Sequence, residues 1–250
     1  PERPAVILLF SVFANDFNLQ DRLIPIGKAY SLPMISIKNA LSSQFSPKTS
    51  KKSVITKAMF FSDMFHPANT GHTLMADCII HFFDEAVRLR NKDREDILVP
   101  LPVRSDEFQD VHYAGRSEAM IIMKDLLNGS FSGCDQDTQM AEMNMSEEPV
   151  PTFMDNWMHA AGNEPFRFRI KCRILIILAK DSGSCEFGKA EVRVDGKMVR
   201  VIDPLKVGWT HNNAFLVIRE NVTREHTVMI EMNKEDAGKK FTLLGIGYVS

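Results

Sequence analysis

The chain has 250 residues with a formal net charge of −2, and 44% of its residues are hydrophobic and 25% charged. This composition is ordinary for a globular protein, and the length allows one or two domains. The weak negative charge and the lack of a basic stripe with interleaved aromatic residues argue against a nucleic-acid partner. No apolar run reaches the roughly 18 residues that a membrane-spanning helix needs, so we expect no membrane partner.

The first part of the chain has an α/β pattern. Residues 5–13 form a continuous apolar run, which is typical of a parallel strand covered on both faces. Residues 19–30 carry apolar side chains at helical spacing, and Pro25 within them predicts a helix that starts late or is kinked. The polar, lysine-containing segment 42–57 is interpreted as a solvated loop.

The motif Asp63-Met64-Phe65-His66-Pro67 places a carboxylate and an imidazole three residues apart. Such a pair can hold a histidine in one tautomer and raise its basicity, as activation of a serine requires. The alternative is that Asp63 caps a helix and that His66 is a surface residue, because short motifs produce false positives.

A long amphipathic helix follows this motif. Asn69 or Thr70 is a plausible N-cap, and apolar side chains recur at helical spacing as far as Arg90. His72 and His81 lie in this helix without metal-ligand partners in the sequence, so we interpret both as packing or surface residues.

Residues 93–128 are interpreted as a linker with a short helix. A charge run at 91–96 precedes Pro100 and Pro102, and residues 117–127 have helical character.

Residues 129–250 have an all-β pattern. The dipeptide Asp195-Gly196, inside the alternating segment 191–201, predicts a hairpin with a type I′ turn. Further strands are predicted at 166–170, 173–179, 214–219, 227–232 and 241–246. Short, regularly spaced strands of this kind favour a β-sandwich or jelly roll.

The four cysteines are scattered, and none belongs to a Cys-x-x-Cys pair. We therefore expect no zinc site and free, buried thiols, with a Cys172–Cys185 bridge as the alternative. Trp157 and Trp209 are the only tryptophans. A tryptophan can stack on a sugar ring, but we favour core positions for both.

The motif Asp63-x-x-His66-Pro67 before a helix resembles the last conserved block of the SGNH (GDSL-type) hydrolases. Residues 5–12 resemble the fourth parallel strand of that family, and residues 32–37 resemble the fifth. The resemblance covers residues 1–92 and implies part of a flavodoxin-like parallel-sheet domain. It also implies that His66 is the general base and that Asp63 orients it.

One departure from the family is large. The chain contains no Gly-Asp-Ser block, and the glycine and asparagine blocks of the oxyanion hole are absent as well. Asn15-Asp16 follows the wrong strand for such a block, and we interpret it as a loop. We therefore expect a missing N-terminal part of the same protein to supply the nucleophilic serine.

Residues 129–250 resemble the jelly-roll-like accessory domain of some bacterial SGNH carbohydrate esterases. The resemblance rests on Asn156-Trp157, residues 188–190, residues 194–196, Gly208-Trp209 and residues 241–247. It implies an ester hydrolase without a cofactor, acting on short acyl esters such as acetyl groups on a carbohydrate.

Two other functions remain open. In the first, the protein is not a catalyst: the β-sandwich binds glycans or docks a protein partner, and the α/β segment is a remnant. The second is a bare scaffold in which Asp63 and His66 only stabilise the start of a helix.

Overall fold

The structure is a computed structural model that describes residues 5–45, 54–89, 101–103, 105–139 and 151–250. The chain divides into two compact units, Pro1–Ser105 (unit 1) and Asp106–Ser250 (unit 2). The lysines at 48, 51 and 52, the charge run 91–96 and Pro100 lie outside the described residues.

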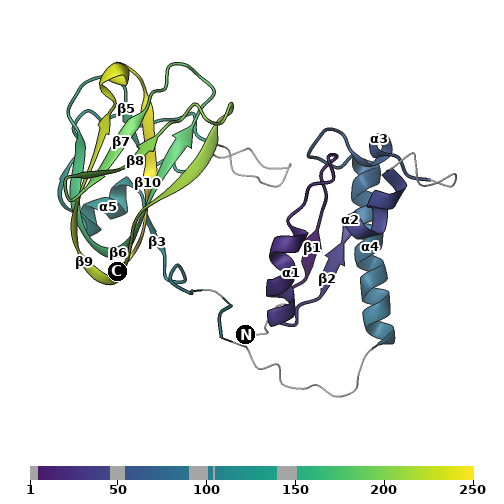
Figure 1. Ribbon diagram of the computed structural model, residues 1–250. Helices are drawn as coiled ribbons and strands as arrows, with labels where there is room; N and C mark the ends of the chain where they lie inside the picture. The colour runs from purple at the N-terminus through teal and green to yellow at the C-terminus, as the bar shows by residue number, and fades with distance from the viewer. Residues whose placement is uncertain (1–4, 46–53, 90–100, 104, 140–150) are drawn as a thin grey trace. The chain divides into compact units, whose positions relative to one another are not determined.

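Unit 1 contains a small parallel sheet with helices around it (Figure 1). Strand β1 (Leu8–Phe10) pairs in parallel with β2 (Met34–Ser36), so that Leu9 lies opposite Ile35. The helical elements are α1 (Gln20–Ala29), α2 (Ile37–Leu41), the 3-10 turn η1 (Ser42–Phe45), α3 (Lys57–Phe60) and α4 (Asn69–Arg88).

The apolar residues of unit 1 pack into one core. Phe45, Phe60 and Phe61 form a group of touching rings, with centroids 4.7–5.6 Å apart. Val12, Ile35, Ile37 and Leu41 complete the buried set, and the apolar stripe of α4 packs against it. The aromatic ring group therefore fixes α3 and the start of α4 against the carboxyl ends of both strands.

Several expectations for unit 1 need correction. The strand predicted over 5–13 pairs only at Leu8–Phe10, because β2 is its one partner in the described part of the chain. The described residues thus form a two-stranded parallel sheet and do not show a flavodoxin-like sheet. Pro25 lies inside α1, which starts early at Gln20, and α4 has Ala68 as its N-cap.

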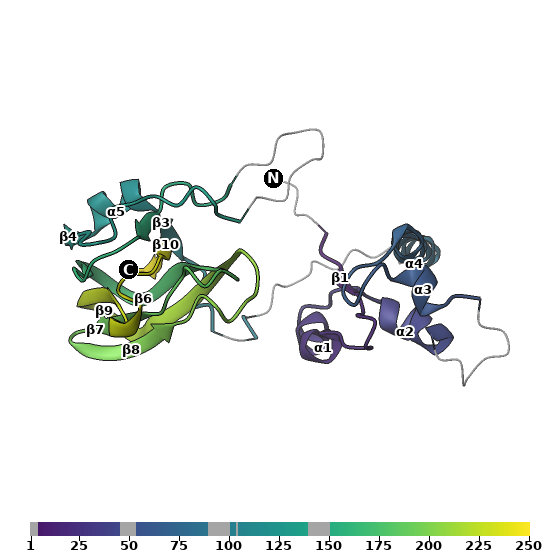
Figure 2. The ribbon, with the colours of Figure 1, turned by 90° about the horizontal axis from the view of Figure 1, so that it is seen from above.

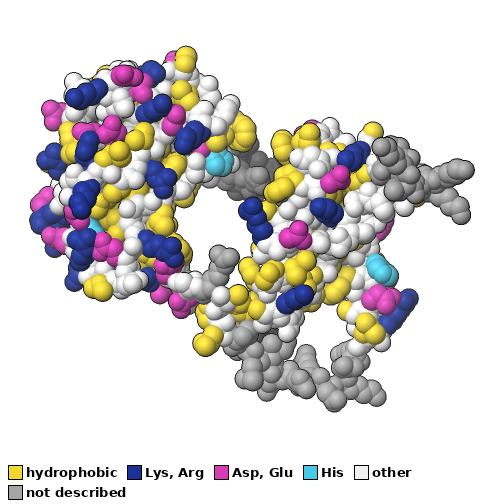
Figure 3. Space-filling view, in the orientation of Figure 1, with side chains coloured by type: hydrophobic (Ala, Val, Ile, Leu, Met, Phe, Trp, Pro, Cys, Tyr) yellow, Lys and Arg dark blue, Asp and Glu magenta, His cyan; other side chains and the backbone are white. Residues whose placement is uncertain are grey.

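Unit 1 leaves many large apolar side chains exposed on its described surface, and hydrophobic side chains are visible over much of it in Figure 3. On α4, Ile80, Phe83 and Val87 are 53–72% exposed. On and before β1, Leu9 is 40% and Val6 is 52% exposed. A single exposed apolar residue is normal, but so many on one small unit make its described surface unusually apolar.

Unit 2 is an antiparallel sheet of eight strands bent around a hydrophobic core (Figure 2). Its centre is the long pair β6 (Phe166–Asp181) and β9 (His211–Met232), joined along their length with two register shifts. Strand β10 (Phe241–Val249) continues the sheet on the other edge of β6. The remaining elements are β3 (His112–Ala114), α5 (Arg116–Ile122), β4 (Lys124–Leu127), β5 (Trp157–His159), β7 (Ala190–Val194), β8 (Lys197–Ile202) and the 3-10 turn η2 (Lys234–Asp236).

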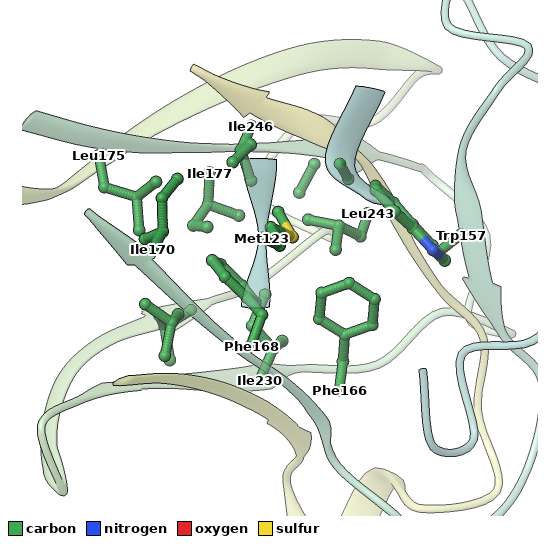
Figure 4. Close-up of a cluster of buried hydrophobic side chains, with 14 of the residues drawn as sticks. Met123, Trp157, Phe166, Phe168, Ile170, Leu175, Ile177, Ile230, Leu243 and Ile246 are labelled. Atoms are coloured by element: carbon green, nitrogen blue, oxygen red, sulfur yellow. The ribbon is translucent and has the colours of Figure 1, made fainter. Parts of the chain in front are cut away.

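The core of unit 2 draws on strands from both halves of the bent sheet. Trp157, Phe166 and Phe168 are fully buried, and their rings meet edge to face at 5.1–5.8 Å (Figure 4). Met123 on the α5–β4 connection and Leu243 on β10 pack into the same cluster. This arrangement agrees with the sandwich-like unit that the alternating sequence predicts.

The hairpin prediction is confirmed. Val194 pairs with Lys197 across a two-residue loop, and the φ angles of Asp195 and Gly196 are 51° and 79°, as a type I′ turn requires. In contrast, the separate strands predicted at 166–170 and 173–179 are one strand, β6, and those at 214–219 and 227–232 are both parts of β9.

Residues 106–128 behave differently from the linker that the sequence predicts. Strand β3 pairs with β10, and β4 pairs with β6, so both belong to unit 2. The predicted helix at 117–127 is shorter, since α5 ends at Ile122 and β4 begins at Lys124.

The cysteines and tryptophans also differ in part from expectation. All four cysteines are free, so no Cys172–Cys185 bridge forms, and only Cys172 is buried. Burial raises the pKa of the Cys172 thiol to about 12. Trp157 is a core residue, whereas Trp209 is 67% exposed, because it lies in the connection between β8 and β9 rather than in a strand.

Candidate functional site

The Asp63–His66 motif forms a tight turn between α3 and α4. Asp63 Oδ1 accepts hydrogen bonds from the backbone N–H groups of Phe65 (2.7 Å) and His66 (2.8 Å). These bonds are those of an Asx turn, in which a short carboxylate folds back on its own backbone. The same carboxylate lies 2.8 Å from His66 Nδ1 through Oδ2. A single side chain thus fixes both the backbone of the turn and the imidazole.

The turn is closed and anchored on both sides. The Ser62 N–H donates to the His66 carbonyl (2.9 Å), and the Ala68 N–H donates to the Phe60 carbonyl (2.8 Å). The Ala14 N–H donates to the Met64 carbonyl (3.0 Å), which ties the turn to the segment after β1. The motif therefore lies next to the carboxyl end of a parallel strand, where ligands of open α/β sheets bind.

Gly71 permits this packing. A Cβ atom at position 71 would lie 2.2 Å from the Phe60 carbonyl oxygen and 2.9 Å from Pro67 Cβ. Only glycine allows the first turn of α4 to approach α3 so closely. The close approach holds the two ends of the Asp63–His66 turn together.

The electrostatics of the pair favour the ionised form of the Asp63 carboxylate. Hydrogen bonding to His66, followed by the backbone N–H groups of Phe65 and His66, lowers the pKa of Asp63 from 3.8 to about 2. An ionised Asp63 requires the proton of a neutral imidazole to sit on Nδ1, which leaves the Nε2 lone pair free to accept a proton. In the described part of the chain, no hydrogen bond to Nε2 is present.

Both side chains are accessible, with 71% of the His66 side chain and 54% of the Asp63 side chain exposed. The neighbouring Phe65 ring meets Phe13 edge to face at 5.3 Å. Phe13 in turn lines a hollow of about 260 Å³ at the carboxyl end of β1, together with Phe10, Ser11 and residues 17–19. The turn thus reaches this hollow through the Phe65–Phe13 contact, and His66 is not part of the lining.

None of the serines near the pair has the geometry of a nucleophile. Ser62 Oγ donates to the backbone carbonyl of His66 (3.1 Å), so it is part of the turn. Ser36 Oγ bonds to Gln20 Oε1 and caps α2 by accepting from the Asn39 N–H (3.1 Å). Ser11 lies in the wall of the hollow after β1. The described residues thus supply an acid–base pair without a serine bonded to it.

Sequence reasoning missed Lys57, which it placed at the end of a solvated loop. Lys57 Nζ donates to the Ala14 carbonyl (2.6 Å) and lies 3.6 Å from Asp16. It therefore braces the segment to which the Asp63–His66 turn is tied. The contact joins positions far apart in the chain, and the sequence contains no signal of it.

Unit 2 holds two further Asp–His pairs that the sequence did not predict. His211 Nδ1 lies 3.1 Å from Asp181, and His226 Nδ1 lies 2.9 Å from Asp195. The His226 side chain is fully buried. No group of three or more His, Cys, Asp or Glu side chains among the described residues could hold a metal ion. The helices that the structure describes include none that is long and apolar enough to cross a membrane.

Comparison with known proteins gives no match to a protein family model and no match to a curated protein sequence. Among solved structures, a two-domain esterase active on acetylated mannans matches with a TM-score of 0.72 and 17% identity, over 99% of this chain and 64% of that one. A crystal structure of such an esterase co-crystallised with mannopentaose matches with a TM-score of 0.69 and 19% identity, over 99% of this chain and 63% of that one.

These matches show the fold. The chain shares its fold with the matched part of these two structures, and it spans slightly less than two thirds of their length.

Proposed function

We propose that the chain is the larger part of a serine ester hydrolase of the SGNH type, acting on short acyl esters of carbohydrates. The observation that carries the proposal is the Asp63–His66 pair, with its 2.8 Å bond to Nδ1 and an Nε2 atom that no described residue bonds. The fold shared with an esterase active on acetylated mannans supports the choice of reaction and of substrate class.

In this proposal, His66 Nε2 takes the proton of a serine hydroxyl as the serine oxygen attacks the ester carbonyl carbon. Asp63 stabilises the imidazolium that forms, because its carboxylate is ionised and bonded to Nδ1. The proton then passes from Nε2 to the leaving alcohol as the ester bond breaks. In the second half of the reaction, His66 Nε2 takes a proton from water as the water oxygen attacks the acyl-serine. The acyl–Oγ bond then breaks, His66 returns the proton to the serine oxygen, and the carboxylic acid leaves.

The serine and the oxyanion-hole donors come from a part of the protein that this chain does not contain. The paired β1 and β2 lack further strands in the described residues, and unit 1 exposes apolar side chains on β1 and α4. Both features support a covering segment that adds strands to the sheet and carries the nucleophile. The added strands would place the serine at the carboxyl edge of the sheet, beside His66.

The test uses the full-length enzyme and an acetylated mannan as substrate. His66→Ala should lower kcat/KM by several orders of magnitude, as removal of a triad member does. Asp63→Asn should cost less than His66→Ala, but at least about tenfold, because the tautomer is no longer enforced. His72→Ala is the matched control, since His72 is an exposed histidine in the first turn of α4. Wild-type turnover by the His66→Ala enzyme would refute the proposal.

A second measurement tests the source of the nucleophile. Residues 1–250 alone should not react with a fluorophosphonate probe, because the serines near His66 are engaged elsewhere. Labelling of this chain that His66→Ala abolishes would identify a nucleophile within it and would refute the proposed division of the catalytic residues.

A further inference from the structure

Three phenylalanine rings of unit 1 form a row that ends at His66. Phe13 lies in the middle of the row, because its ring stacks on Phe17 (5.8 Å between centroids) and meets Phe65 edge to face (5.3 Å). Phe65 in turn lies edge to face with the His66 imidazole, at 6.4 Å. The rings of Phe17 and Phe65 are 47% and 56% exposed. We call these three residues the aromatic row; they give a partly exposed aromatic surface that is linked, contact by contact, to His66.

The loop that carries two of the rings is held by its own backbone. The Phe13 N–H donates to the Phe17 carbonyl (3.0 Å), and the Asp16 N–H donates to the Phe13 carbonyl (2.9 Å). The Ala14 N–H, which donates to the Met64 carbonyl, joins this loop to the turn that carries Phe65. The rings therefore stand on an ordered backbone, which lowers the entropy cost of binding a ligand.

The aromatic row borders a space that a ligand can enter. Phe13 and Phe17 line the hollow of about 260 Å³ at the carboxyl end of β1, and Leu19 and Leu23 are among the other residues of its largely apolar lining. The same loop also displays charge, since Asp16 lies 3.6 Å from Lys57, with side chains 53% and 41% exposed. Aromatic and apolar walls with a small number of polar groups beside them are typical of small-ligand sites.

We propose that the aromatic row binds a sugar ring in the alcohol part of the ester. The inference rests on the proposed function, in which His66 Nε2 gives its proton to the oxygen of the leaving alcohol. That oxygen must come within hydrogen-bonding reach of Nε2, so the alcohol part of the substrate lies next to His66 and the adjoining Phe65 ring. A pyranose ring has a face of C–H groups that packs on aromatic rings, and its hydroxyl groups can bond to Asp16 and Lys57.

The position of the row favours the sugar over two other occupants. The acyl group is transferred to the serine, which this chain does not contain, so it lies on the far side of the ester bond from the leaving alcohol. A protein segment packed on the rings would bury the exposed Asp16–Lys57 pair or leave it at the edge of an apolar contact. Such a pair beside aromatic rings suits the hydroxyl groups and the C–H face of one sugar.

The test compares two acetyl esters as substrates of the full-length enzyme: acetylated mannopentaose, and ethyl acetate, whose alcohol has no ring. Phe17→Ala should lower kcat/KM for acetylated mannopentaose about tenfold relative to ethyl acetate. The loss should appear as a higher KM, because stacking on the sugar is the same in the ground state and the transition state. Phe65→Ala should change the ratio in the same direction, and Phe17→Trp should restore it.

The matched control is Phe83→Ala, since Phe83 is a 53% exposed ring on α4 outside the aromatic row, and it should leave the ratio unaltered. An unaltered ratio in Phe17→Ala would overturn the site; equal losses for both esters together with a lower Tm would show that the rings pack on protein instead. The proposed function fails in a different way, through full activity of His66→Ala. A wild-type enzyme that hydrolyses neither ester would refute both proposals, whereas loss of both activities in His66→Ala with an unaltered ratio in Phe17→Ala would refute only the sugar site.

Discussion

Replacement of Lys180 by methionine should strongly destabilise unit 2. Lys180 is 1% exposed at the end of β6, and its ammonium lies 3.0 Å from Asp135 Oδ2. It also donates to the Asp137 carbonyl and lies 5.0 Å from the centre of the Phe187 ring. Methionine fills a similar volume but carries no charge. The Asp135 carboxylate, which is 5% exposed, would keep its hydrogen bond from Thr242 but lose its ion pair with Lys180.

The expected size of the effect follows from this burial. Removal of one partner of a buried ion pair costs about 3–5 kcal/mol, because a charge is left unpaired in the interior. For a unit of this size, such a loss lowers Tm by about 10–20 °C. Both tryptophans lie in unit 2, so a thermal melt followed by tryptophan fluorescence measures this unit specifically.

A double variant separates the lost charge pair from a general packing defect. Lys180→Met combined with Asp135→Asn has no stranded charge, so its Tm should be higher than the sum of the two single effects predicts. Lys124→Met is the control, since Lys124 and Glu225 form an exposed pair in the same unit that should contribute little. A Tm of Lys180→Met equal to that of the wild type, or strictly additive effects, would refute the reasoning.

Two further predictions concern unit 1 and the limits of the units. The Asp63 carboxyl should titrate with a pKa of about 2, and in His66→Ala the value should rise toward 3.8, as read by NMR of the carboxyl carbon. Because the pKa is lowered in the folded state, the pair stabilises the fold above pH 4, and this contribution is lost as the pH falls toward 2. A pKa of Asp63 near 3.8 in the folded wild-type protein would contradict the prediction. A fragment of residues 106–250 should melt cooperatively. Its melting temperature should be higher than that of residues 128–250, which lack β3, β4 and the core residue Met123. Residues 1–105 alone should show no cooperative melt. Equal melting temperatures for the two longer pieces would argue that β3 and β4 do not stabilise unit 2.

Features with a local cause could be predicted from the sequence. The Asp195-Gly196 turn follows from residues that tolerate positive φ, and the helix of α4 follows from its apolar spacing. The continuity of β6 and β9 could not be predicted, because their register shifts depend on pairing between residues far apart in the sequence, such as Cys172 with Arg224 and Ile176 with Leu216. The pairing of β3 with β10 joins Ala114 to Ile246, which no local pattern encodes.

The same distinction applies to the three Asp–His contacts. Asp63 and His66 are three residues apart, and one Asx turn brings them together, so their contact is implicit in the motif. Asp181 and His211 are 30 positions apart in the sequence, and Asp195 and His226 are 31 positions apart, so each pair depends on strand pairing. The sequence alone therefore does not predict that His211 and His226 contact these aspartates.

This local origin has a consequence for how the proposed enzyme is assembled. The Asp63–His66 geometry is fixed by the turn, by Gly71 and by the ring group of Phe45, Phe60 and Phe61, all within unit 1. The pair therefore needs no contact with the nucleophile to adopt its tautomer. Under the proposed function, a segment that adds strands beside β1 would be enough to bring a serine to the carboxyl edge of the sheet, near Nε2. A variant that loses activity but keeps the lowered pKa of Asp63 would therefore have an intact acid–base pair. Its defect would lie in the added strands instead.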